Sequence, residues 1–184
     1  MDGLSNHLVP LGILCGAGVV VLAAAIEDVR HFRIPNAYCL ALVLLFPLYV
    51  LVSPVPMEWW WNLAFAAALF AFGALAYRTG KFGGGDAKML AAAGIWAGPS
   101  DIVAYLIITA LAGGVVAMAL VCMTVARTLW FPSAKTDAEP DKMEGKPELT
   151  PDFTFKTRIP YGVAIAAGAS TVLAGLALSV LTAK

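Results

Sequence analysis

The sequence has little charge for its length and little that would suit a soluble domain. Asp, Glu, Lys and Arg make up 13% of its 184 residues, whereas hydrophobic residues make up 60%. Ordinary soluble domains carry about 25% charged residues and have no place for so much apolar surface. The composition therefore excludes an ordinary soluble domain. The formal net charge is zero, so nothing in the totals indicates a nucleic acid partner.

Cysteine and histidine are too few and too scattered for a metal site. Cys15, Cys39 and Cys122 lie in apolar stretches, with no Cys-x-x-Cys pair and no histidine at ligand spacing. We therefore expect no metal, no disulfide and no cofactor. His7 and His31 fall on opposite sides of the membrane in the topology below, so neither Ser–His nor Cys–His catalysis is indicated.

Long uncharged runs dominate what is present. A spanning helix needs about 20 mostly apolar residues. Five such runs are plain. A sixth is short and stops at Gly98-Pro99. We predict an all-α polytopic membrane protein, a single membrane-embedded domain over residues 1–184, with about six transmembrane helices and a short fourth one. The runs are Leu8 to Ile26, Ala37 to Val52, Asn62 to Tyr77, Ala87 to Ala97 (the short one), Ile102 to Ala126 and Tyr161 to Ala183.

Basic residues set the orientation, because Lys and Arg in short loops favour the cytoplasmic side. Six alternating spans place every Lys and Arg except Lys184 on one side, which predicts an outside N-terminus. The chain turns polar and proline-bearing from Ser133 to Asp152, so a mobile cytoplasmic loop is expected at about 127–158. The residues on the basic side are Arg30, Arg33, Arg78, Lys81, Lys88, Arg127, Lys135, Lys142, Lys146, Lys156 and Arg158.

Two acids stand at the membrane boundary on that same side. Asp28 lies where the first predicted helix leaves the membrane, and Asp86 lies where the fourth enters. Acids in or near a membrane are candidates for function. Each also has a purely structural interpretation, since Asp86 could cap a helix and Asp28 could pair with Arg30 or Arg33.

Their joint presence, beside three glycines, indicates chemistry. Gly83, Gly84 and Gly85 allow tight bends and leave room for another chain to approach. Two neighbouring aspartates cannot both ionise cheaply, so they share a proton. The ionised one can then take a proton from water while the protonated one polarises a carbonyl, which would hydrolyse a peptide bond.

These residues resemble a known family, the type IV prepilin peptidases. The resemblance is carried by Asp28 with Ile34-Pro35-Asn36, and by a Gly-x-Gly-Asp motif, Gly83-Gly84-Gly85-Asp86, which runs into Ala87-Lys88-Met89-Leu90. The later Ile159-Pro160-Tyr161-Gly162 is similar to the small subgroup that serves tight-adherence (Flp-type) pili. The similarity extends from the first predicted helix to the last.

The resemblance implies a six-helix aspartyl peptidase of the bacterial inner membrane, with Asp28 and Asp86 as its catalytic pair. It implies a prepilin (pseudopilin) as substrate, whose basic leader is cut after a glycine at the cytoplasmic face. Active-site support is then expected from Gly83, Gly85, Lys88, Pro35 and Asn36. Pro35 should separate the first two spans, and Asn36 should cap the second.

Some properties of the larger family members are not expected here. Those members carry a cytoplasmic insertion with paired cysteines and also methylate the new N-terminus. The first internal loop of this chain is about ten residues long and has no cysteine, so no methyltransferase activity is expected. The sequence leaves the oligomeric state and the particular prepilin open.

The sequence is compatible with three alternatives. A presenilin-like intramembrane protease shares Gly-x-Gly-Asp, but this chain has no Pro-Ala-Leu motif and is short for that architecture. A small transporter could use Asp28 and Asp86 to relay protons or bind a cation, although such sites are expected near the bilayer midplane. A non-catalytic assembly factor would need neither acid.

Overall fold

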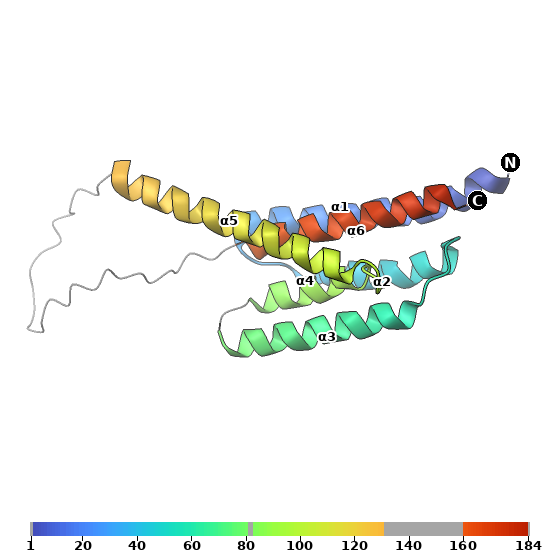
Figure 1. The fold of residues 1–184 in the computed structure, drawn as a ribbon, viewed down its shortest axis with the longest axis horizontal. Helices are drawn as coiled ribbons and strands as arrows, with labels where there is room; N and C mark the ends of the chain where they lie inside the picture. Colours follow the sequence, from blue (N-terminus) through green and yellow to red (C-terminus); the bar gives the residue numbers. More distant parts are fainter. Residues whose placement is uncertain (1, 81–82, 131–159, 184) are drawn as a thin grey trace, which may run out of the picture.

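The computed structural model describes residues 2–80, 83–130 and 160–183, and in that part of the chain every regular element is an α-helix (Figure 1). Four helices contain stretches long and apolar enough to cross a membrane, at His7–His31, Trp59–Arg78, Ile102–Ala126 and Tyr161–Thr182. The expected all-α polytopic membrane class is thus confirmed. The six helices are α1 (Asp2–His31), α2 (Asn36–Val52), α3 (Trp59–Arg78), α4 (Gly84–Gly94), α5 (Ile102–Trp130) and α6 (Tyr161–Thr182).

The fourth helix is short, as its sequence predicted, but its boundaries differ from the expected 87–97. It begins at Gly84 and ends at Gly94, so it is about 16 Å long, half the thickness of a bilayer core. Asp86 falls in its first turn, where an acid stabilises the free N–H groups and the helix dipole. The helix therefore starts before the acid, and not after it.

Two layers of helices make up the bundle (Figure 1). In the first layer α6 packs against both α1 and α5, and in the second α3 packs against α4. The two layers meet where α2 contacts both α1 and α4, and where α4 contacts α6. Most of α4 is buried, which explains how a helix too short to span can lie in the middle of the bundle.

Small residues allow the helices within each layer to approach closely. A Cβ added at Gly73 of α3 would lie 2.8 Å from the Cβ of Ala87 in α4. A Cβ at Gly168 of α6 would lie 2.8 Å from the carbonyl oxygen of Tyr105 in α5. Close approach through small residues is the usual way in which membrane helices associate.

One end of the bundle collects the ends of α1, α3 and α5 and the starts of α2, α4 and α6 (Figure 1). Arg30, Arg33, Arg78 and Lys88 belong to this end, as the charge distribution predicted. Helix α5 continues to Trp130, so its last residues overlap the start of the loop expected at about 127–158. The remainder of that loop lies outside the described residues, as do Lys81, Lys135, Lys142, Lys146, Lys156, Arg158 and Lys184.

Candidate active site

Asp28 lies in the last turns of α1 and is directed at the start of α6. Only 5% of its surface is exposed, and the backbone N–H of Gly162 donates a hydrogen bond to its Oδ2 atom at 2.7 Å. Helix N-termini have free N–H groups and a positive dipole end, which suit a carboxylate. Asp28 thus finds a backbone partner on a helix that is remote in sequence.

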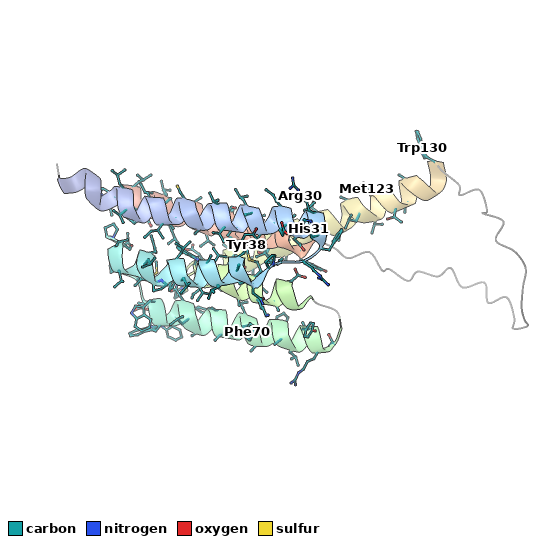
Figure 2. The ribbon with its side chains drawn as sticks, turned by 180° about the vertical axis from the view of Figure 1, so that it is seen from behind. Arg30, His31, Tyr38, Phe70, Met123 and Trp130 are labelled. Atoms are coloured by element: carbon teal, nitrogen blue, oxygen red, sulfur yellow. The ribbon has the colours of Figure 1, made fainter. Side chains whose placement is uncertain are left out.

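The arginines near Asp28 do not take the role that the sequence suggested for them. At the end of α1, His31 Nδ1 lies 3.1 Å from Glu27 Oε1, and within the described residues this is the contact found between a basic and an acidic side chain. Figure 2 shows Arg30 and His31 at this end of α1, beside the linker to α2. A simple Asp28–Arg30 or Asp28–Arg33 surface pair is therefore not observed in the described part of the chain.

Gly162 is a glycine for a steric reason. A Cβ added there would lie 2.8 Å from Oδ2 of Asp28 and 2.9 Å from its Cβ. Such distances are shorter than real side-chain contacts allow, so any larger residue would displace the carboxylate or the helix. The close approach of α1 and α6 at this point depends on the missing side chain.

Asp86 occupies the third position of α4, half-buried at the same end of the bundle. Burial, and next the negative charge of Asp28, raise the pKa of Asp86 to about 7, while a backbone hydrogen bond from Gly83 acts in the opposite direction. The effect of Asp28 on Asp86 means that the fold brings the two acids within electrostatic reach. A carboxyl group that keeps its proton near neutral pH, with a second acid at the same end of the bundle, is suited to general acid–base chemistry.

The glycines before Asp86 have different surroundings. A Cβ at Gly83 would collide with the Asp86 carboxylate, so this position needs glycine while the acid keeps its orientation. A Cβ at Gly85 would be in ordinary contact with Ile34, 3.5 Å from its Cβ, which places Gly85 against the linker between α1 and α2. Gly83 and Gly85 thus both lie at the site, and the need for glycine is steric at Gly83.

Pro35 and Asn36 occupy the start of α2, next to α4. Pro35 has extended backbone angles, φ −58° and ψ 138°, and it separates α1 from α2 as predicted. The expected capping role of Asn36 is wrong, because Pro35 holds the N-cap position and no side-chain cap bond forms. Asn36 is instead the first residue of α2, and its Oδ1 accepts a hydrogen bond from Lys88 Nζ at 3.1 Å.

The Lys88–Asn36 contact stands at one end of an open groove of ≈ 340 Å³ between α2, α3 and α4. Its other walls are apolar and include Cys39, Phe70 and Ala92; Figure 2 labels Phe70 on α3. Lys88 therefore connects α4 to α2 near the two acids. Within the described residues no three His, Cys, Asp or Glu side chains come together as a metal site would require.

The fold and this pair of acids define a class, a helical membrane protein with the groups for acid–base chemistry gathered at one end of the bundle. Comparison with known families is more specific: residues 15–118 match the type IV leader peptidase family. The match covers more than half of the chain, which therefore belongs to that family and is a peptidase. Neither the curated proteins nor the solved structures gave a match.

The matched stretch contains both acids and ends within α5. Gly162 lies outside it, and reasoning from the sequence missed the contact of Gly162 with Asp28. The Ile159-Pro160-Tyr161-Gly162 segment was a signal, but no spacing rule connects residue 28 with residue 162. Only the packing of α1 against α6 reveals that contact.

Proposed function

We propose that this protein is an aspartyl endopeptidase that uses Asp28 and Asp86 to remove the basic leader peptide from type IV, Flp-type prepilins. The observation that supports this most is that the two acids, which belong to separate layers of the bundle, lie at the same end of it, where the charge of Asp28 raises the pKa of Asp86. An arrangement that only capped helices would not require the acids to interact. Membership of the leader peptidase family supports hydrolysis of a peptide bond.

The reaction needs one ionised and one protonated carboxyl group. The carboxylate takes a proton from water, whose oxygen attacks the scissile carbonyl carbon, and the carboxylic acid gives its proton to the carbonyl oxygen. The tetrahedral intermediate then collapses as the C–N bond breaks and a proton passes to the leaving nitrogen. The pair ends with the one proton that it had at the start, so no covalent intermediate is needed.

Supporting residues hold the acids in place. Gly83 leaves space for the Asp86 side chain, and Gly85 packs against Ile34 in the α1–α2 linker. Pro35 ends the extended linker, and Lys88 ties the start of α4 to Asn36. In this proposal these contacts fix the position of α4, and thereby of Asp86, relative to the end of α1.

We further propose that the site faces the cytoplasm of a bacterium, in the inner membrane, with the N-terminus outside. Support comes from the basic residues at the end of the bundle that holds Asp28 and Asp86, since Lys and Arg favour the cytoplasmic side. The small-subgroup motif, which runs into the start of α6, supports an Flp-type substrate. The position of both acids at one end also argues against a transport site, which is expected near the midplane.

Cleavage of a co-expressed Flp-type prepilin tests this function. Asp28→Asn and Asp86→Asn keep the side-chain shape but remove the carboxyl group, and each alone should abolish the shift of the prepilin to its mature size on a gel. Asp101→Asn is a matched control, because Asp101 bonds to Ser100 in the α4–α5 connection, away from the two acids. At equal membrane levels, near-normal cleavage by either Asp28→Asn or Asp86→Asn would show that the acid concerned is structural.

A further inference from the structure

We infer that the start of α6 assigns different roles to the two acids: Gly162 is a positioning residue that holds Asp28 as the ionised base, which leaves Asp86 as the acid. This inference rests on the proposed function for its catalytic meaning. It concerns a residue that lies outside the stretch matched by the family. Its physical basis is a contact between α1 and α6 that can be tested without a substrate.

The geometry places a donor on one of the two carboxyl groups. The N–H of Gly162 points at Oδ2 of Asp28 from 2.7 Å, in a buried setting. A backbone N–H can only donate, so it favours the form of Asp28 that accepts, the carboxylate. The positive end of the α6 dipole acts on the same charge.

Proximity makes this contact selective for Asp28. The three atoms nearest to a Cβ added at Gly162 are Oδ2, Cβ and Cγ of Asp28, all within 3.1 Å. The backbone hydrogen bond to Asp86 comes instead from Gly83, the N-cap residue of its own helix. The donor to Asp28 lies on α6, a different helix from the α1 that carries Asp28, so the packing of α6 helps to fix the position of Asp28.

Two of the charged side chains on the elements around Asp28 have partners of their own. Glu27 contacts His31 on the same helix, and Lys88 donates to Asn36. Asp28 and Asp86 repel each other when both are charged, so only one of them ionises cheaply. The remaining titratable or charged groups at this end of the elements packed around Asp28 are Arg30, Arg33, Tyr38, Cys39 and Tyr161.

The assignment gives direction to the hydrolysis described above. Asp28 removes the proton from water as the new C–O bond forms, and Asp86 protonates the carbonyl oxygen. When the C–N bond breaks, Asp28 passes its proton to the leaving nitrogen and Asp86 recovers a proton from the hydroxyl group of the intermediate. Water and peptide yield acid and amine, and both side chains return to their starting state.

Gly162→Ala tests the positioning role, with Gly175→Ala as the matched control. Both glycines lie in α6, but a Cβ at Gly175 meets nothing within 4 Å. The alanine at 162 should lower the rate of prepilin cleavage at least tenfold. It should also move the acidic limb of the pH–rate profile to higher pH, because Asp28 loses its donor. Gly175→Ala should match wild type, and equal profiles for the two variants would overturn the inference.

A second measurement does not depend on activity or on the tolerance of position 162. Infrared difference spectra of the full chain in lipid, recorded from pH 4 to 9 against the Asp28→Asn/Asp86→Asn double variant, report the carboxylic-acid C=O stretch of the remaining acids. The acid that remains in Asp86→Asn is Asp28, and the acid that remains in Asp28→Asn is Asp86. Asp28 should stay ionised to a lower pH than Asp86. The reverse order would refute the assignment.

The two measurements also separate this inference from the proposed function. If wild type cleaves no prepilin but the spectra show the expected order, the substrate is wrong and the assignment stands. If wild type cleaves and the order is reversed, the peptidase stands and the roles of Asp28 and Asp86 must be exchanged.

Discussion

The protonation of Asp86 predicts how cleavage depends on pH. Burial and the charge of Asp28 raise the pKa of Asp86 from 3.8 to about 7, so this carboxyl group keeps its proton up to neutral pH. If it acts as the acid, about nine tenths of the enzyme is competent at pH 6 and about one tenth at pH 8. The initial rate of cleavage should therefore fall about tenfold between these values. The assay is a time course of prepilin maturation at substrate levels well below saturation.

Loss of activity must be separated from loss of structure. Since the pKa of Asp86 is higher in the folded than in the unfolded chain, folding takes up a proton, and this acid makes stability fall as pH rises from about 4 to about 7. Above that window its contribution is constant, so the drop in rate above pH 7 should not be accompanied by a further drop in unfolding temperature. A flat rate from pH 6 to pH 9 would refute the role of a protonated Asp86.

Two substitutions at contacts between helices test the packing. Gly73→Ala places a Cβ 2.8 Å from the Cβ of Ala87 and 3.1 Å from its Cα, which should cost about 1–3 kcal/mol by overpacking and lower the unfolding temperature in detergent. Gly16→Ala is its control, because a Cβ there meets nothing within 4 Å, and a similar loss in both would contradict this account. Tyr105→Phe removes a buried 2.9 Å hydrogen bond to the carbonyl of Leu90, which should cost about 1–3 kcal/mol; an unchanged unfolding temperature would show that the bond adds no net stability.

The helices and their common end could be predicted from the sequence because a bilayer imposes length and charge rules on each segment separately. Boundaries were less accurate, since a change to charged residues marks the edge of an apolar run and not the end of a helix. α1 continues through Glu27 and Asp28 to His31, and a Glu27–His31 contact spans its last turn.

The contacts within the site were harder to predict than its two acids. Asp28 and Asp86 are recognisable because acids are rare near a membrane. The partner of Asn36, by contrast, depends on where α4 lies relative to α2, and Lys88 takes the amide oxygen that a helix cap would have used. The approach of Gly162 to Asp28 likewise depends on helix packing that no local pattern encodes.

The division of the two acids between the layers of the bundle gives the proposed peptidase a form of latency. Asp28 belongs to α1, which packs against α6 in one layer. Asp86 belongs to α4, which packs against α3 in the other. Before the layers associate, each acid is an ordinary residue near a helix end, with no second carboxyl group to share a proton. Catalytic competence would then arise with tertiary assembly in the bilayer, much as a split enzyme gains activity when its halves join. A newly inserted, incompletely packed chain would have no means of cutting its neighbours.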